Sequence, residues 1–368
     1  MDTFETEIYL RYKQIIESQT AYSLTCHPGL VPGSPFHREN ESVQPRHVHM
    51  ADLLDRYDAF CFDGYGTLYN RGSFVYPGAM EWFQMLRRAK KQIRLVTNAA
   101  SDVDEVLARD ADKRGFDFTA EETISSGSLL RELTEQLRRG EIAAIYETAN
   151  ADGTAAIYET AIADGTAAIS ETATLCKTAV KPFELREVYY IGRETGKHVL
   201  DACGITAVAM DAEPAEPIVA ISSAKDTPET YAQAVKILQK PGAILLVLNS
   251  DAWAPKIPDE KGITLREPVS GALSERLRRA SMCDANGGEG CATYYLGKPF
   301  PAIWERVKSS LPAGSRVLMI GDTLGTDVYG AKVAGFDSAL VVGRNVPAEE
   351  LEADEMVLGI RPDYYLMP

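Results

Sequence analysis

The sequence predicts an α/β fold, in which a doubly wound, Rossmann-like parallel sheet carries a large inserted α/β domain. Two observations support this prediction. In the first and last thirds of the 368-residue chain, short apolar stretches that end in small polar residues alternate with stretches of helical spacing. Between these parts lie about 180 residues with strand candidates of their own, enough for a separate domain.

The elements of the main sheet are expected where apolar runs of strand length are bounded by turn residues. Pro77 stands where a helix start is expected, and Gly335 where a helix should end. The expected strands are residues 57–63, 92–101, 292–299, 315–323 and 337–343, and the expected helices are 77–91, 301–311 and 327–335. Strands and helices that alternate in this way indicate a parallel sheet covered on both faces.

The inserted domain is expected to fold around strands at 188–192, 218–222 and 244–250. An amphipathic helix over residues 1–20 and a proline-rich, irregular segment over 24–50 precede the main sheet. We therefore expect an N-terminal extension, a core domain in two pieces and a cap domain inserted between them. Their limits are 1–50 for the extension, 51–109 and 291–368 for the core, and 110–290 for the cap.

A repeat with a period of 12 residues lies in the inserted domain, within residues 140–185. It reads AAIYETANADGT, AAIYETAIADGT and AAISETA over residues 143–173. Two and a half copies of this length cannot stack into a solenoid core. The repeat is therefore expected to be a duplication in a surface excursion, with helical segments joined by turns at DGT.

The composition argues against two classes of partner. With 53 Asp and Glu against 38 Lys and Arg, the formal net charge is -15, whereas nucleic-acid binding calls for a basic face. No apolar run approaches the ~18 residues of a membrane-spanning helix, and the first residues are polar and acidic. The six cysteines are scattered without metal-ligand spacing, which favours free thiols. We therefore expect a cytoplasmic protein with no nucleic-acid or membrane partner.

Four strand ends carry groups that suit phosphate chemistry. In a doubly wound sheet, ligands bind beyond the carboxyl ends of the strands, so groups at these ends meet at one edge. The groups are Asp63 with Gly64, Gly66 and Thr67, then Thr97 with Asn98, then Lys298, and finally Asp322 with Asp327. Each short motif taken alone is more often a turn or a helix cap, but together they form a coherent set.

The set would serve phosphoryl transfer. A carboxylate such as Asp63 can attack phosphorus and form an aspartyl phosphate. The charge on the phosphoryl oxygens needs positive and hydrogen-bonding partners, which a lysine, a threonine hydroxyl and the backbone N–H groups of the glycine turn can supply. Asp63 and Asp322 would suit one Mg²⁺ ion, with Asp327 as a further ligand or as a support for a metal-bound water.

In order and spacing, these motifs resemble the haloacid dehalogenase (HAD) superfamily of aspartate-nucleophile hydrolases, and within it class IIA, the 4-nitrophenyl phosphatase-like branch. VTNAAS (96–101) is similar to a strand-end signature of that class. Asp63 and Thr97 are only 34 positions apart, too few for a large cap, whereas 201 positions separate Thr97 from Lys298. Three segments of the insert also resemble class IIA segments, namely TISSGSLL (123–130), VYYIGRETG (188–196) and LNSDAW (248–253).

The resemblance implies a metal site and a phosphoryl site that share the nucleophile, Asp63. The implied ligands of the Mg²⁺ ion are Asp63, the backbone carbonyl of Tyr65, Asp322 and, in support, Asp327. The implied phosphoryl-binding groups are Thr97, Asn98 and Lys298, together with the turn of Gly64 and Gly66. The substrate would be a small phosphorylated metabolite, and the resemblance also allows a homodimer through the cap. Asn249 and Asp251, at the end of a cap strand, would either face that substrate or form a turn.

Tyr65 departs from the family pattern. Phosphatases of this superfamily carry Asp there, which protonates the leaving oxygen and then activates water. A phenol with an ordinary pKa near 10 is a poor base at neutral pH. The sequence therefore favours a Mg²⁺-dependent phosphatase and leaves two alternatives. One is a catalytically impaired protein that binds a phosphorylated ligand, and the other is a carbon–halogen hydrolase, because dehalogenases of the superfamily carry Tyr in this motif.

Overall fold

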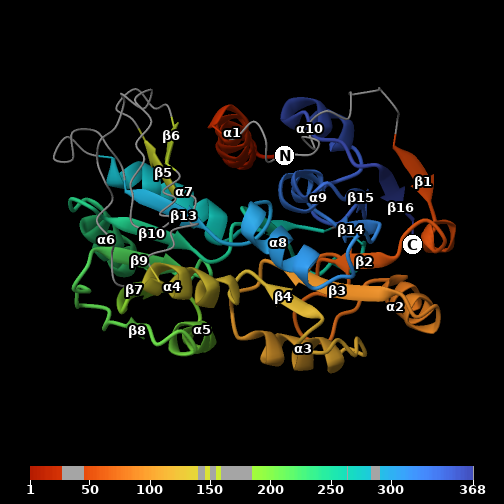
Figure 1. Ribbon diagram of the computed structural model, residues 1–368, viewed down its shortest axis with the longest axis horizontal. Coiled ribbons are helices and arrows are strands. Elements are labelled where there is room, and N and C mark those ends of the chain that lie inside the picture. The colour runs from red at the N-terminus through yellow and green to blue at the C-terminus, as the bar shows by residue number, and fades with distance from the viewer. Residues whose placement is uncertain are drawn as a thin grey trace.

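Two seven-stranded sheets lie side by side in the computed structural model, with helices packed on both (Figure 1). The structure describes residues 1–26, 45–139, 146–149, 155–158, 185–262, 264–282 and 291–367. The α/β fold, with a parallel core sheet and a second sheet, is confirmed. A third, two-stranded antiparallel sheet consists of β11 (Trp253–Pro255) and β12 (Arg266–Pro268).

The first sheet is parallel throughout, and the chain forms one of its edge strands before it crosses to the middle of the sheet. Its strands, in spatial order, are β1 (Arg46–Val48), β16 (Tyr364–Leu366), β15 (Asp337–Leu340), β14 (Val317–Gly321), β2 (Ala59–Phe62), β3 (Gln92–Thr97) and β4 (Thr123–Ser125). From β2 the chain moves outward through β3 to β4, and from β14 it moves outward the other way. The boundary between β2 and β14 is thus a switch point, where the strand ends leave a crevice for ligands.

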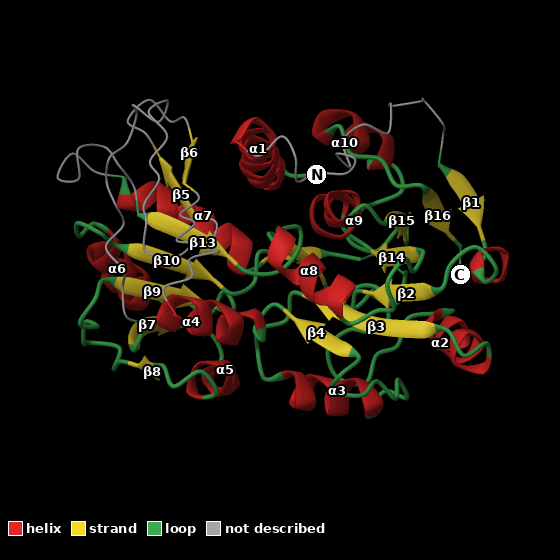
Figure 2. Ribbon diagram, viewed as in Figure 1, coloured by secondary structure: helices red, strands yellow, loops and turns green. Residues whose placement is uncertain are grey.

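Both faces of the first sheet are covered, which explains why β2 reads as a continuous apolar run. One face carries α2 (Ala79–Arg88) and α3 (Asp104–Asp112), and the other carries α8 (Pro301–Ser309), α9 (Tyr329–Ala334) and α10 (Leu351–Leu358) (Figure 2). Phe60 and Phe62 pack into the core that α2 covers. Ala59 and Cys61 face the opposite core, beside Trp304 of α8.

The second sheet is parallel except at one edge. Its strands, in spatial order, are β6 (Ala155–Tyr158), β5 (Tyr146–Ala149), β13 (Ala292–Tyr295), β10 (Ile244–Val247), β9 (Ile218–Ile221), β7 (Glu187–Ile191) and β8 (Thr206–Ala207). Its helices are α4 (Leu129–Arg139) and α5 (Lys197–Asp201) on one face and α6 (Pro228–Leu238) and α7 (Ser270–Ser281) on the other. The strand ends of β7, β9 and β10 therefore point the same way.

The expected strands of both sheets are present, but two segments lie in a different sheet from the one expected. The segment TISSGSLL, assigned to the cap, contains β4, which pairs with β3 in the first sheet. The segment after residue 291, assigned to the core, begins with β13, which pairs with β10 in the second sheet. The chain thus leaves the first sheet after Ser125 instead of near 110, and returns after Tyr295 instead of near 290. The domain limits themselves stay a prediction.

The N-terminal helix α1 (Thr3–Cys26) is longer than expected and lies between elements of the two sheets, as Figure 1 shows. On one side it packs against α7, and on the other against α10 and a π-helical turn, η5 (Leu324–Val328). Tyr9 and Tyr12 of α1 are both buried in the same core cluster as residues from each of these elements. The helix therefore joins the two halves of the molecule.

Several expectations about irregular regions need correction. Parts of the repeat form β5 and β6, an antiparallel pair, instead of helical segments. Within the segment 24–50, expected to be irregular, α1 continues to Cys26 and Arg46–Val48 forms β1. The rest of the repeat and of the irregular segment lies outside the described residues. In the part of the chain that the structure describes, no helix is long and apolar enough to cross a membrane, and Cys61, Cys203 and Cys291 are free thiols, as expected.

Candidate active site

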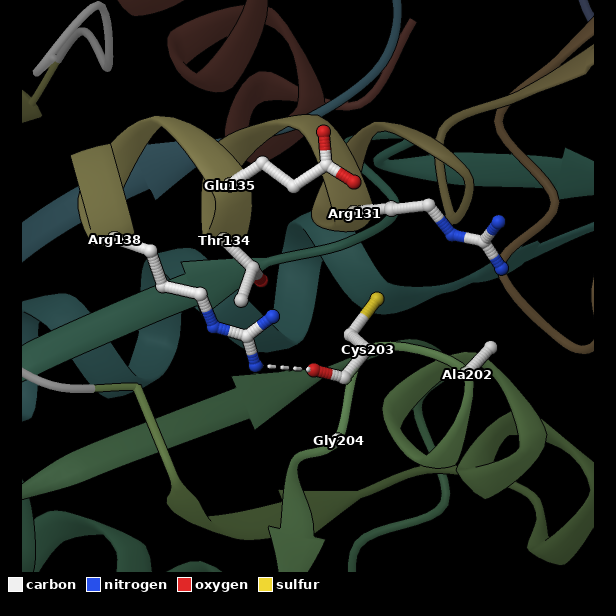
Figure 3. A pocket seen from close by; sticks show the side chains of 7 residues that line it. All are labelled: Arg131, Thr134, Glu135, Arg138, Ala202, Cys203 and Gly204. Atoms are coloured by element: carbon white, nitrogen blue, oxygen red, sulfur yellow. Dashed lines mark hydrogen bonds between the residues drawn. The ribbon is translucent and has the colours of Figure 1, made fainter.

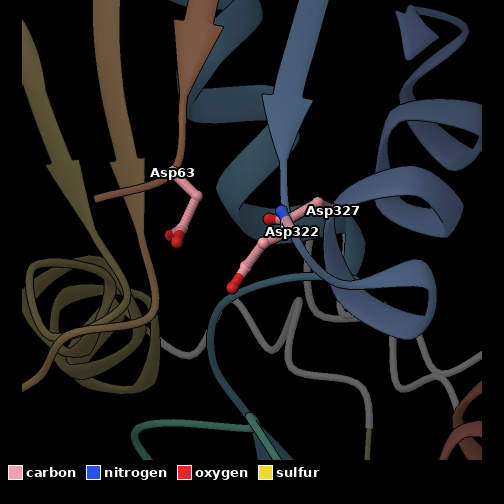
Figure 4. Close-up of side chains that lie close together, drawn as sticks. All are labelled: Asp63, Asp322 and Asp327. Atoms are coloured by element: carbon pink, nitrogen blue, oxygen red, sulfur yellow. Dashed lines mark hydrogen bonds between the residues drawn. The ribbon is translucent and has the colours of Figure 1, made fainter. Parts of the chain in front are cut away.

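Three aspartates meet where β2 and β14 end. Asp63 directly follows β2, Asp322 directly follows β14, and Asp327 lies on η5 (Figure 4). One carboxylate oxygen from each residue lies within 4.8 Å of an oxygen of the other two, and all three residues are buried. The sequence expectation that these acids gather at one edge therefore agrees with the geometry.

Lys298 lies between the acids and uses all three of its ammonium protons. Its Nζ donates to Asp63 Oδ1 at 2.6 Å, to Asp327 Oδ1 at 2.7 Å and to the carbonyl oxygen of Val96 at 2.9 Å. The side chain is only 1% exposed. Lys298 follows β13 of the second sheet, so the chain that returns from that sheet brings a cation into the acid cluster.

The acids differ in how far their oxygens are satisfied. Asp327 accepts hydrogen bonds at Oδ2 from the backbone N–H groups of Asp322 and Thr323, both at 3.1 Å, and at Oδ1 from Lys298. Asp322 Oδ2, in contrast, is buried with no hydrogen-bond partner among the described residues. A Cβ on Gly66, whose φ is +97°, would lie 1.9 Å from that oxygen, so only glycine leaves room beside it.

Two of the three acids, Asp63 and Asp322, have raised pKa values. Burial, opposed by Lys298 and reinforced by the charge of Asp327, raises the pKa of Asp63 to about 7. Burial and the charges of Asp63 and Asp327 raise the pKa of Asp322 well above its ordinary value. Burial alone would lower the pKa of Lys298, but the carboxylates of Asp327 and Asp63 raise it, so this lysine is held as a cation. One cation against three buried carboxylates leaves an excess of negative charge.

This donor set fits a hard divalent cation. Mg²⁺ prefers carboxylate and carbonyl oxygens and is held by one or two protein carboxylates plus other oxygens. Asp322 Oδ2 is buried and unpartnered, and Asp63 lies beside it within the acid cluster. A bound cation would also balance the excess charge of the cluster. Asp327, with both oxygens already engaged, fits a supporting position better than a direct ligand.

Thr97 is the last residue of β3, and Asn98 follows it at the same edge. Thr97 is buried, and its hydroxyl accepts from the backbone N–H of Ala99 at 3.2 Å. The amide of Asn98 donates to Asp251 Oδ1 at 2.8 Å and to the carbonyl of Lys298 at 3.0 Å, and accepts from the backbone N–H of Lys298 at 2.7 Å. The Asn98 side chain is therefore a bridge between the sheets, and only its backbone could contact a phosphoryl group.

Tyr65 lines the crevice with its side chain largely buried. Its ring meets the ring of Tyr69 edge-on, with centroids 5.2 Å apart. Burial, and to a lesser extent the charge of Asp110, raises the pKa of Tyr65 above its ordinary value of 10.0. The phenol is therefore even less able to exchange a proton near neutral pH than a free tyrosine.

The second sheet provides the other wall of a cavity of about 170 Å³ above the acids. The residues that line the cavity from the side of the second sheet follow the ends of β7, β9 and β10 or belong to the segments around β11 and α7. They are Arg193, Ser222, Ser223, Asn249, Asp251, Trp253, Ala254, Pro255, Val269 and Ser270. Asn249 both lines the cavity and forms a turn, since its Oδ1 accepts from the backbone N–H of Asp251 at 2.9 Å. Burial raises the pKa of Asp251 to about 6 against the opposing charge of Lys298.

Sequence reasoning missed several polar residues of this cavity, among them Arg71, Arg193 and Asn345. Arg193 follows β7 by two positions, so the strand-end argument applied to the cap segment VYYIGRETG would have found it. The strand-end argument would not have found Asn345. It lies in the loop after β15, where its amide donates to the hydroxyl of Thr323 at 2.8 Å.

A second cavity, of about 370 Å³, contains none of the expected site residues. It lies between α4 and the turn after α5, and Figure 3 shows Arg131, Glu135 and Arg138 reaching over it from α4. Arg138 Nη2 donates to the carbonyl oxygen of Cys203 at 3.1 Å. The contacts around this cavity are those of a helix packed on a turn.

Comparison with known proteins identifies the family. A family model described as haloacid dehalogenase-like hydrolase matches residues 60–160, and one described as HAD-hydrolase-like matches residues 295–367. The chain is a phosphatase-like hydrolase of the HAD superfamily. The two matched segments contain the acid cluster, one holding Asp63 and the other Lys298, Asp322 and Asp327.

The similarity extends over most of this HAD-superfamily chain. The 4-nitrophenylphosphatase of Schizosaccharomyces pombe is 26% identical over 336 residues, which cover 86% of this chain and 93% of that protein. A possible sugar phosphatase of the HAD superfamily from Cytophaga hutchinsonii shares the fold, with a TM-score of 0.63, 20% identity and coverage of 88% of this chain and 97% of its own. The glycerol phosphate phosphatase of Mycobacterium tuberculosis, solved in complex with magnesium, superposes with a TM-score of 0.54 at 22% identity, over 86% of this chain and 76% of its own.

Proposed function

We propose that this protein is a Mg²⁺-dependent hydrolase of small phosphate monoesters that works through an aspartyl phosphate on Asp63. The observation that carries the proposal is the buried group of Asp63, Asp322 and Asp327 around Lys298 at the switch point of a parallel sheet. The names of similar proteins support the substrate class, since they include 4-nitrophenylphosphatase and a glycerol phosphate phosphatase in complex with magnesium.

In the proposed first step, a carboxylate oxygen of Asp63 attacks phosphorus. The bond from phosphorus to the ester oxygen breaks, and this oxygen leaves with the bonding electrons and takes up a proton. Lys298 keeps Asp63 oriented through the 2.6 Å contact and offsets the charge that gathers at the phosphoryl group. Thr97, the backbone of Asn98 and the turn of Gly64 and Gly66 would bind the phosphoryl oxygens.

In the second step, water attacks the phosphorus of the aspartyl phosphate. The bond between phosphorus and the Asp63 oxygen breaks, which releases inorganic phosphate and restores the carboxylate. When bound by Asp63, Asp322 and the backbone carbonyl of Tyr65, Mg²⁺ would neutralise charge on the phosphoryl oxygens. Asp327 would hold the backbone of Asp322 and Thr323 in place through its 3.1 Å hydrogen bonds.

Tyr65 stands in place of the general acid–base aspartate that we infer for related phosphatases. Its raised pKa keeps the phenol protonated near pH 7, so it is a poor base toward water and a much weaker acid toward the leaving oxygen than a carboxylic acid. General acid–base assistance is worth roughly 10²–10⁴ in rate, so turnover is expected to be slow for esters with basic leaving groups. Activated esters, whose leaving oxygen needs no proton, would be hydrolysed fastest.

The proposal is tested with 4-nitrophenyl phosphate at pH 7, with and without Mg²⁺. We expect nitrophenolate release that requires Mg²⁺ and is lost, by about 10⁴-fold or more, in the Asp63→Asn variant. The control is Asp55→Asn, a change at an exposed acid shortly before β2. Folding of each variant is verified by thermal melting.

Other outcomes would support one of the alternative functions for the same site. Halide release from a haloacid that continues in chelator would indicate carbon–halogen hydrolysis by Asp63. No turnover of any ester, combined with stabilisation by inorganic phosphate and Mg²⁺, would indicate an impaired binding protein. If the protein shows neither turnover of any ester nor stabilisation by inorganic phosphate and Mg²⁺, the phosphoryl site is rejected altogether.

A further inference from the structure

The two arginines that line the active-site cavity differ in whether they have an acidic partner. Arg71, in the loop after β2, forms an ion pair with Glu267 of β12. Arg193, after β7, is exposed and has no acidic partner among the described residues. The neighbouring Glu194 pairs with Lys197 at 2.8 Å instead. Arg193 thus brings an uncompensated positive charge to the wall formed by the second sheet.

Hydroxyl groups of the same wall also lack partners. The Oγ atoms of Ser223 and Ser270 are buried, and neither has a hydrogen-bond partner among the described residues. Ser270 is fully buried and is the first residue of α7, where the helix presents its positive end to the cavity. Ser222, next to Ser223, shows the contrast, since its hydroxyl is bonded to that of Tyr190.

Buried polar groups without partners are unfavourable unless a ligand or water satisfies them. All three groups, Arg193, Ser223 and Ser270, line the same cavity as Asp63. They stand on the wall opposite the acid cluster, because they follow strands and a helix of the second sheet. A ligand whose phosphoryl group lies at Asp63 would therefore direct its leaving-group end toward them.

We propose that this wall is a second anion subsite and that the preferred substrates are small phosphate monoesters with a further anionic group, a carboxylate or a second phosphate, on the alcohol part. Arg193 makes the charged contact, and the hydroxyls of Ser223 and Ser270 donate hydrogen bonds to the anion or to polar groups beside it. The cavity of about 170 Å³ restricts the alcohol part to a few heavy atoms or one ring. This inference rests on the proposed phosphatase function and specifies its substrate class.

The test compares 4-carboxyphenyl phosphate with 4-carbamoylphenyl phosphate, two esters of nearly equal shape that differ in one negative charge. For the wild-type protein with Mg²⁺, we expect kcat/KM to be higher for the carboxylate ester. In Arg193→Gln the ratio of the two kcat/KM values should fall about tenfold, because a hydrogen-bonded charge pair is lost. Arg193→Lys, which keeps the charge, should retain part of the preference.

Arg88→Gln is the matched control, since Arg88 is an exposed arginine in the last turn of α2 and does not line the cavity. Its ratio should equal that of the wild type. A wild-type ratio near one, or a ratio that Arg193→Gln leaves unchanged, would overturn the inference.

The inference can fail separately from the proposed function. Hydrolysis of 4-nitrophenyl phosphate without discrimination between the two test esters would reject the subsite and leave the phosphatase function standing. If no ester is hydrolysed, the phosphatase function fails. In that case the Kd values of both esters are measured by calorimetry with Mg²⁺ for two variants, Asp63→Asn and Asp63→Asn combined with Arg193→Gln. The subsite predicts that the first variant binds the carboxylate ester more tightly than the carbamoyl ester and that the second variant loses this preference. Equal Kd values for the two esters in the first variant would reject the subsite.

Discussion

The two walls of the active-site cavity differ in which of their polar groups lack partners. On the wall that holds the acid cluster, Lys298 is bonded to two aspartates and a carbonyl and Asp327 is bonded at both oxygens, and Asp322 Oδ2 is the oxygen left for a cation. On the second sheet, Arg193 and the hydroxyls of Ser223 and Ser270 have no partner among the described residues. The first wall is thus preorganised for one reaction. The second wall has groups left over for a ligand, which is where substrate selection is expected.

Among the tests of this comparison, the largest effect is expected at Tyr65, which we propose stands in place of a general acid–base aspartate on the first wall. In Tyr65→Asp, we expect turnover of an alkyl phosphate, whose leaving oxygen is basic, to rise by roughly 10²–10⁴. The gain for 4-nitrophenyl phosphate should be much smaller, because nitrophenolate leaves without a proton. Steady-state kinetics on the two esters measures the difference.

Tyr65→Phe is the companion control, since it keeps the ring packed on Tyr69 but supplies no carboxylate. It should show no gain on either ester. An equal gain on both esters in Tyr65→Asp would show that proton transfer is not what the wild-type protein lacks.

The second prediction tests whether the first wall holds excess charge. The folded-state pKa of Asp322 is raised well above its ordinary value of 3.8, so the unfolded chain loses this proton first and the folded protein loses stability as pH rises above about 4. In chelator, Asp322→Asn should therefore be more stable than the wild type at pH 7. Mg²⁺ at 100 times its Kd should stabilise the wild type by about 2.7 kcal/mol and the variant by much less.

Urea unfolding with chelator and with Mg²⁺ measures both parts of this prediction. Asp55→Asn, at an exposed position, should respond to Mg²⁺ as the wild type does. A variant that is less stable than the wild type in chelator would contradict the charge argument.

The third prediction concerns Glu5 of α1, which is buried and pairs with Arg266 at 2.7 Å. Burial, against the opposing charge of Arg266, raises the pKa of Glu5 from 4.5 to about 7. Between these pH values the folded state keeps a proton that the unfolded state releases, so stability falls as pH rises from about 4.5 to about 7. Glu5→Gln should remove about 3 kcal/mol of this fall.

The measurement is the unfolding free energy of wild type and Glu5→Gln at several pH values across this window. Glu7→Gln, at a half-exposed position on the same helix, should leave the pH profile unchanged. Identical profiles for Glu5→Gln and the wild type would mean that the Glu5 side chain remains ionised throughout.

The smallest expected effect tests the contact of α1 with the second wall. The hydroxyl of Tyr12 donates to the carbonyl oxygen of Ser250 at 3.0 Å in a buried setting. Tyr12→Phe leaves that carbonyl unpaired, so the unfolding free energy should fall by about 1 kcal/mol. Tyr231→Phe is the control, since the Tyr231 hydroxyl bonds in an exposed setting and its loss should have little effect.

Much of this site could be predicted because its residues follow strand ends. Asp63, Thr97 and Asp322 each come directly after, or at the end of, an apolar run, and parallel strands bring such ends to one edge. The sheet to which a strand belongs could not be predicted in the same way. The apolar runs of β4 and β13 read alike whichever sheet they join, and only pairing with β3 or β10 decides.

The sequence also could not predict which polar side chains have hydrogen-bond or ion-pair partners. The Asn98 side chain looks like a phosphate ligand in the motif, yet its amide is consumed by contacts with Asp251 and Lys298, which are 153 and 200 positions away. The sequence does not show that Arg71 is paired and Arg193 is not, because Glu267, the partner of Arg71, is 196 positions away. Such distinctions depend on contacts between distant segments.

The position of α1 has a consequence for the order in which the molecule forms. The helix is synthesised before either sheet, but the groups it binds come late, since Tyr12 bonds to Ser250 and Lys13 bonds to the carbonyl of Leu358, 345 positions away. Contacts of such sequence separation are slow to form, because the loop they close must be ordered first. Docking of α1 therefore has to follow the assembly of both sheets, and the last contacts to form during biosynthesis are those that fix one sheet against the other.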